Sequence, residues 1–195
     1  NVYKTYYTTE PTNERFNYLI NTWTYNSEHY TNMVDGLVEN DKYGNIVGAL
    51  AVGYKTVNNE DGTQTWYFQL REDAKWVDNA SGQVKADVVA QDFVDAIEYV
   101  LNPLNGSGTA SIVTGLVKGS LEYYQAKALG EEADFATVGV KAESKYVVSY
   151  TLYRVTPYFL SSLTYSPFLP VNKAFLNEKG TDFGISANNI LVNGA

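Results

Sequence analysis

Large apolar residues occupy every second position of the segment 65–70, with more polar residues between them. This period of two, in aromatic and β-branched residues, predicts a half-buried strand. An Asp-Gly pair at 61–62 separates it from a shorter apolar segment at 53–57, and such pairs are typical of hairpin turns. The pattern therefore predicts a β-hairpin that carries Trp66 and Trp76, two of the three tryptophans.

A helical period is clearest between Asp87 and Leu101. Apolar residues recur there at spacings of three and four, and Pro103 ends the pattern. Asp87 is the expected N-terminal cap of this helix. The helix has one apolar face, which we expect to pack against the sheet that contains the hairpin.

The remaining segments predict shorter elements of both kinds, so the expected fold class is α+β, with a mixed sheet, β-hairpins and flanking helices. Further helices are expected at 27–36, capped by Ser27 and closed by Gly36, and at 121–129, 157–163 and 173–177. Further strands are expected at 1–9, 37–39, 138–142, 146–153 and 190–195. Two prolines predict extended backbone at 166–171.

Composition narrows the possible partners. The formal charge of −8 argues against nucleic acid and anionic membranes. The absence of cysteine excludes disulfides, thiolate metal sites and a cysteine nucleophile. No apolar run is long enough to cross a bilayer, and residue 1 starts no signal peptide, so the protein is expected to be cytosolic or to have lost an export signal. Seventeen tyrosines suit binding surfaces that must stay soluble.

Ten short strings, in order along nearly the whole chain, carry a family resemblance. They are DGL at 35–37, DKYGN at 41–45, ALA at 49–51, the Asp-Gly turn at 61–62, WYFQLREDAKW at 66–76, A-x-DF at 90–93, VGV-x-A at 138–142, PYF at 157–159, PV at 170–171 and NGA at 193–195. The chain resembles the amino-terminal part of the oligopeptide-binding lipoproteins of ABC importers, of the OppA and DppA type. This resemblance favours a Gram-positive source.

The resemblance implies a protein of two lobes that encloses a peptide and delivers it to the permease subunits of an ABC importer. The chain then corresponds to the first lobe, and the second lobe is absent. Residues 1–42 and 166–195 are expected to form the main subdomain of this lobe, and residues 43–165 an accessory subdomain. The resemblance also implies an extracytoplasmic, cell-surface location, with membrane contact only through an amino-terminal lipid anchor that this chain does not carry.

Peptide capture needs exposed backbone, hydroxyl groups and aromatic walls rather than a catalytic group, so no enzymatic activity, cofactor or metal is expected. By position against the family, three segments are expected to reach the cleft. Their candidate ligand-binding residues are Thr24, Tyr25, Asn26 and Ser27, then Gly108, Thr109 and Ser111, and then Tyr165 and Ser166. Structural roles are the alternative: Ser27 can cap its helix and Tyr25 can pack.

Other functions stay open at this point. Exposed tyrosine and tryptophan also suit a carbohydrate-binding module, although the long helix at 87–101 is unusual in such modules. A family relative can bind nickel, haem or a sugar instead of peptides. A glycosidase could use paired carboxylates such as Glu72 and Asp73, but neighbours on a strand point to opposite faces. His29 is the single histidine, and the chain has no cysteine or second histidine to complete a zinc site.

Overall fold

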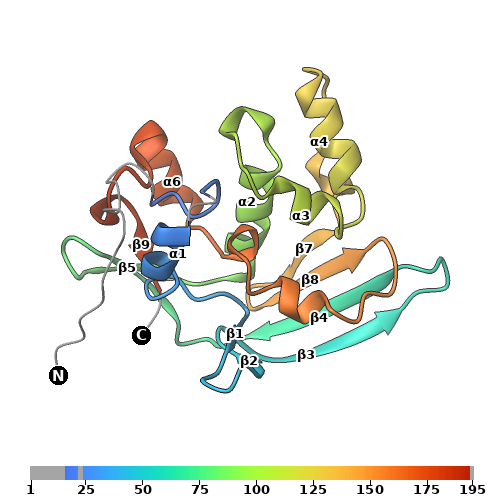
Figure 1. Cartoon of the computed structure of the whole chain (residues 1–195), viewed down its shortest axis with the longest axis horizontal. Coiled ribbons are helices and arrows are strands. Elements are labelled where there is room, and N and C mark those ends of the chain that lie inside the picture. The colour runs from blue at the N-terminus through green and yellow to red at the C-terminus, as the bar shows by residue number, and fades with distance from the viewer. Residues whose placement is uncertain (1–15, 22–23, 194–195) are drawn as a thin grey trace.

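The predicted hairpin forms one half of a four-stranded antiparallel sheet. The computed structural model describes residues 16–21 and 24–193, and Figure 1 shows their arrangement. The strands run in the order β3 (Ala51–Asn58), β4 (Gln64–Leu70), β8 (Val147–Leu152) and β7 (Val140–Ser144). The hairpin and the strand pair expected at 138–153 are therefore confirmed, and β4 joins them through its register with β8.

One face of this sheet carries an aromatic core. Trp66 and Phe68 of β4 stack with an interplanar angle of 11°, and Phe159 contacts the Trp66 ring from above the sheet. Tyr150 of β8 is fully buried beside Phe159. The helices lie on this face of the sheet, as Figure 1 shows. The period of two along β4 thus separates its core residues from its more polar ones, as predicted.

The long helix α2 (Ala90–Val100) packs on β7 and β8. Its start corrects the predicted cap: Asp87 ends strand β6, where its carboxylate pairs with Lys75 and Lys145. The N-cap residue of α2 is Val89, whose backbone N–H donates to the Asp92 carboxylate at 2.9 Å. A side chain inside the first turn therefore satisfies this N–H, as in one half of a capping box.

A second sheet contains three antiparallel strands, in the order β6 (Val84–Asp87), β5 (Lys75–Asp78) and β9 (Leu191–Val192). Trp76 lies in β5, so it belongs to this sheet and the predicted placement of Trp76 on the hairpin is wrong. The strand expected at 190–195 is confirmed as β9 over Leu191–Val192. β5 belongs to the predicted accessory subdomain and β9 to the predicted main subdomain, so their pairing joins the two within one sheet. The division into subdomains stays a prediction.

The other elements are short. A small hairpin joins β1 (Val38–Asn40) to β2 (Ile46–Gly48). The remaining α-helices are α1 (Thr24–Tyr30), α3 (Ala110–Thr114), α4 (Ser120–Ala128), α5 (Phe159–Ser162) and α6 (Lys173–Lys179). The 3₁₀ turns are η1 (Pro103–Asn105), η2 (Phe135–Thr137), η3 (Ser166–Phe168), η4 (Gly180–Asp182) and η5 (Ala187–Asn189).

Two predictions about these elements need correction. Ser27 lies inside α1 rather than at its N-cap, because α1 starts three residues earlier, and the helix ends at Tyr30 rather than at Gly36. Residues 166–168 form η3 rather than extended backbone, since Pro167 can occupy the first turn of a helix as well as a strand. The strand expected at 1–9 lies outside the described residues. None of the helices described has the length and apolar character to span a membrane.

Asp92 is a buried carboxylate that ties three parts of the fold together. Its Oδ2 accepts hydrogen bonds from the Trp76 indole N–H at 2.8 Å and from the Val89 backbone, and its backbone carbonyl accepts from Val171. Burial raises the pKa of Asp92 to about 6, against the opposing effect of the two hydrogen bonds. The folded chain therefore binds a proton at Asp92 more tightly than the unfolded chain does.

We expect Asp92 to make the chain more stable in weak acid than at neutral pH. The favourable contribution is fully present below the ordinary carboxyl pKa and is lost as the pH rises through about 6, a difference on the order of 3 kcal/mol. Asp92→Asn should abolish this loss, because its amide oxygen can accept the same hydrogen bonds without a charge. Urea unfolding of the unchanged chain and of Asp92→Asn at pH 4.5 and 7.5 measures how the free energy of unfolding depends on pH. Equal pH dependence in the two proteins would contradict the assignment.

Candidate functional site

The second and third segments predicted to reach a cleft contact each other and the residues that flank the first. The loop before α3 is attached to the segment that leads into α1: the Ser107 hydroxyl donates to the Leu19 carbonyl at 2.7 Å, and the Gly108 N–H donates to the Ile20 carbonyl at 3.2 Å. Both bonds end on backbone carbonyls, so they hold the loop before α3 at a fixed distance from residues 19–20. The second predicted segment is therefore attached to residues 19–20, which precede α1, although about 85 residues separate the two segments along the chain.

The third segment contacts the second and lies near the end of α1. Turn η3 packs against α3. The Ser166 side chain lies near the Tyr30 hydroxyl at the end of α1. Burial raises the pKa of Tyr30, and the Ser166 side chain opposes that shift. Figure 1 shows α3 above the four-stranded sheet and α1 on the side of the fold where β5 and β9 lie, so η3 connects the two parts.

The predicted residues differ in how much of them a ligand can reach. Asn26 is only 2% exposed, so its side chain serves the fold rather than a ligand. The backbone carbonyl of Ser27 accepts from the Thr31 N–H and hydroxyl, and the Ser27 side chain is half-buried. Thr24 and Tyr25 form the first turn of α1.

The other two segments present more accessible groups. Gly108 and Ser111 are exposed, and Thr109 and Ser166 are half-buried. The Thr109 hydroxyl lies 3.2 Å from that of Ser107. Tyr165 is 58% exposed, and its ring is the largest reachable group of the set. A ligand at this surface therefore meets an aromatic ring, several hydroxyls and exposed glycine backbone.

A hollow of about 230 Å³ borders this surface, between the end of α1, β1 and the turn before η3. Thr31, Thr164 and Asp35 are among the residues that line it. Burial raises the pKa of the Asp35 carboxyl, and the nearby Arg71 guanidinium opposes that shift. Asn193 holds this segment in place, since its Oδ1 accepts from the Asp35 N–H at 2.6 Å and its N–H donates to the Met33 carbonyl. Sequence reasoning missed these residues, because the contacts join segments far apart in the chain.

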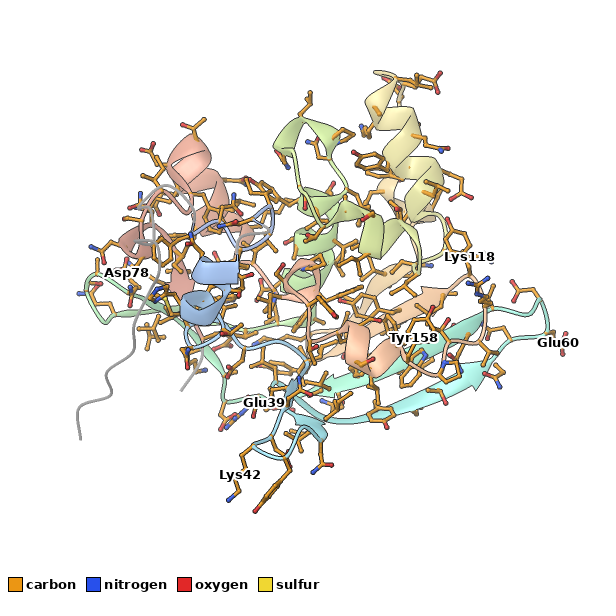
Figure 2. All side chains as sticks on the ribbon, viewed as in Figure 1. Glu39, Lys42, Glu60, Asp78, Lys118 and Tyr158 are labelled. Carbon is orange, nitrogen blue, oxygen red and sulfur yellow. The ribbon has the colours of Figure 1, made fainter. Side chains whose placement is uncertain are left out.

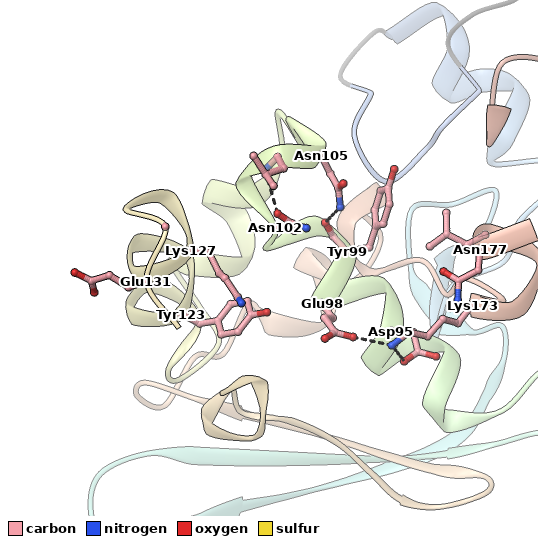
Figure 3. A pocket seen from close by; sticks show the side chains of 13 residues that line it. Asp95, Glu98, Tyr99, Asn102, Asn105, Tyr123, Lys127, Glu131, Lys173 and Asn177 are labelled. Atoms are coloured by element: carbon pink, nitrogen blue, oxygen red, sulfur yellow. Dashed lines mark hydrogen bonds and ion pairs between the residues drawn. The ribbon is translucent and has the colours of Figure 1, made fainter. Parts of the chain in front are cut away.

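A larger cavity, of about 530 Å³, lies elsewhere, between α2, α4 and α6 (Figure 3). Its floor carries Asp95 and Glu98, which share the Lys173 ammonium at 3.3 and 2.8 Å. These ion pairs join α2 to α6. None of the predicted residues lines this cavity. Within the described part of the chain, no three histidine or carboxylate side chains form a group that could hold a metal ion.

With this fold and surface established, comparison with known proteins defines the class. The family model of bacterial extracellular solute-binding proteins, family 5 Middle, matches residues 45–195. The chain therefore belongs to this family of solute-binding proteins. The expected fold class, helices and sheets of one lobe of a two-lobed solute-binding fold, is confirmed by the structural neighbours below. All strand pairs among the described residues are antiparallel.

Two curated relatives are similar over nearly the whole chain. The oligopeptide-binding protein SarA of Streptococcus gordonii is 39% identical over 93% of this chain, and AliB of Streptococcus pneumoniae serotype 4 is 40% identical over 98%. This chain spans only 26% and 28% of their respective lengths. It is thus similar to about a quarter of each relative.

Solved structures show the same fold. Listeria monocytogenes OppA bound to peptide superposes with a TM-score of 0.79 at 24% identity, over 93% of this chain and 33% of that one. The substrate-binding domain of an oligopeptide ABC transporter from Bacillus anthracis superposes with a TM-score of 0.75 at 28% identity, over 95% and 33% respectively.

Proposed function

We propose that this chain is the first lobe of an extracytoplasmic oligopeptide-binding protein, which captures peptides between two lobes and delivers them to the permease of an ABC importer. The observation that carries the proposal is the similarity to SarA and AliB, both oligopeptide-binding proteins, along almost all of this chain. In such a protein, ligand contacts to both lobes favour the closed form over the open one.

The surface around Tyr165 supports this proposal. Hydroxyls at Thr109 and Ser166 and the exposed backbone at Gly108 can hydrogen-bond an extended peptide whatever its sequence. The half-exposed ring of Tyr165 offers a flat apolar face to side chains of different kinds. We propose these residues, together with the first turn of α1, as this lobe's share of the peptide site.

We further propose that the protein acts outside the cytoplasm on a lipid anchor, and that it catalyses no reaction. The family of extracellular solute-binding proteins supports the location. A solute-binding protein needs only to hold and release its solute, and this supports the proposal that it catalyses no reaction.

Calorimetric titration of a mixed pool of short peptides tests the proposal. We expect saturable heat from a form extended past Ala195 by the sequence of a second lobe, and weak or undetectable heat from this chain alone. The reason is that one wall of the cleft holds only part of the contacts. No detectable heat from the extended form would count against peptides as the solute, and an oligosaccharide pool would be titrated next.

Two matched tyrosine variants locate the site in the extended form. Tyr165→Ala should weaken peptide affinity by roughly 5- to 30-fold, the loss typical of a well-placed aromatic contact. Tyr158→Ala is the control, because Tyr158 is 56% exposed, close to the 58% of Tyr165, but lies at the start of α5 and outside the three segments. Equal affinities for the two variants would remove Tyr165 from the proposed site.

A further inference from the structure

One edge of the four-stranded sheet has no partner strand in the described chain. β3 pairs with β4 alone, and Figure 1 shows it at the outer side of the sheet. At the hairpin turn the Asn59 N–H donates to the Thr63 carbonyl. Because antiparallel ladders alternate, the backbone groups of Tyr54, Thr56 and Asn58 point away from β4. Their N–H and C=O groups therefore form a free hydrogen-bonding edge.

An apolar groove of about 190 Å³ runs beside the first part of this edge. The β1–β2 hairpin forms one wall, Leu160 contributes from above, and the start of β3 forms the other wall. Val52 is 68% exposed at the groove and Tyr54 is half-exposed there. A free strand edge thus lies directly beside a hollow that can take an apolar side chain.

The usual protection of an edge strand is weak here. Natural edges are blocked by proline, by charged side chains or by bulges. β3 contains no proline, and its β-bulge lies at its very start, between Ala51 and Gly53. Its one charged residue, Lys55, lies with its ammonium 4.9 Å from the centre of the Tyr67 ring, over its own sheet. The edge from Tyr54 to Asn58 therefore stays accessible.

We propose that the β3 edge binds an extended, apolar peptide segment that carries a carboxylate, by addition of a strand to the sheet. Only an extended backbone matches the alternating donors and acceptors of the edge, and the groove supplies a pocket for one of its side chains. Lys55 is the only charged residue between Ile46 and Asn58 and favours an acidic group on the incoming strand. This site is separate from the proposed cleft.

Charge and shape disfavour a second copy of the chain as the occupant. A second β3 would bring its own Lys55 to the same short edge, where like charges repel. The β1–β2 hairpin walls the groove on one side, where a second sheet approaching the edge would meet it. Figure 2 shows Lys42 projecting from the tip of that hairpin, away from β3.

Amide hydrogen exchange followed by NMR tests the proposal on this chain. The probe is acetyl-Val-Thr-Val-Glu-Val-amide, with both ends blocked. Without peptide, the amides of Tyr54, Thr56 and Asn58 should exchange fast, and those of Lys55 and Val57 slowly, because the latter bond to β4. Peptide at millimolar concentration should slow the first set by about tenfold or more and leave the second set unchanged. Unchanged exchange at Tyr54 and Thr56 would overturn the proposal.

A matched pair of charge variants gives the second readout. Val52→Glu places a carboxylate in the groove that has to take an apolar side chain of the probe, and should weaken the probe's Kd by roughly tenfold because burial beside a charge is unfavourable. Val84→Glu adds the same charge at a similarly exposed valine, 63% against 68%, on β6 of the other sheet, and should leave the Kd unchanged. Equal Kd values for the two variants, or protection of the edge that rises with protein concentration without peptide, would also overturn the proposal.

Discussion

Trp76→Ala is expected to lower the free energy of unfolding by about 4 to 5 kcal/mol, a large part of the total for a domain of this size. The Trp76 side chain is fully buried, so its removal leaves a cavity in the core. The indole N–H also donates to Asp92, and its loss leaves that carboxylate with one donor fewer. Urea unfolding followed by far-ultraviolet circular dichroism measures the effect without depending on tryptophan fluorescence.

Trp76→Phe separates the two causes. A phenylalanine ring fills much of the same space but has no N–H, so we expect a smaller loss of about 1 to 3 kcal/mol, from the hydrogen bond that Asp92 loses and the remaining void. A loss below about 1 kcal/mol for Trp76→Ala itself would show that the indole does not occupy the core in solution.

Gly119→Ala is the second change with a large expected effect. Gly119 precedes α4 with a φ of +75°, a conformation in which an alanine is strained. An added Cβ would also overlap the Thr137 carbonyl oxygen, which belongs to backbone and cannot move aside cheaply. We expect the two costs together to lower the free energy of unfolding by about 3 kcal/mol or more, measured by the same urea titration.

Gly130→Ala is the matched control for that change. Gly130 has a φ of +76°, almost the same, but no other atom lies within 4 Å of its added Cβ. Only the conformational strain remains, with an expected cost of about 1 to 2 kcal/mol. Equal losses for the two variants would show that the close approach of Gly119 to Thr137 carries no energy of its own.

Local pattern was sufficient for elements whose partners are close in the chain. The alternation in β4 and the Asp-Gly turn predict the hairpin, and the spacing of apolar residues predicts α2. Burial of one face of a strand or helix produces a regular spacing of apolar residues in the local sequence. Trp76 was assigned to the wrong sheet because β5 pairs with β9, far away in the sequence. The N-cap of α2 is predicted wrongly for a related reason: Asp87 lies at the end of β6, where its carboxylate forms ion pairs with Lys75 and Lys145.

The candidate site shows the same division. Family resemblance singles out three segments, and the fold places the second and third in contact through α3 and η3, but single residues need the structure. Asn26 is buried although it belongs to a predicted segment. The approach of Ser166 to Tyr30 has no local signal, and neither does the attachment of Asn193 to residues 33–35, since a tertiary contact leaves no period in the sequence.

The pairing of β5 with β9 has a consequence for how the chain folds. Val77 aligns with Val192 and Asp78 with Leu191, so the three-stranded sheet is completed by almost the last residues described. Such a contact closes a very long loop, and the loss of chain entropy makes it slow to form. During synthesis the four-stranded sheet can assemble as soon as β8 has left the ribosome, while β5 waits with one edge open. We therefore expect the small sheet to form last, and a nascent chain stalled before Leu191 to be the species most prone to aggregate.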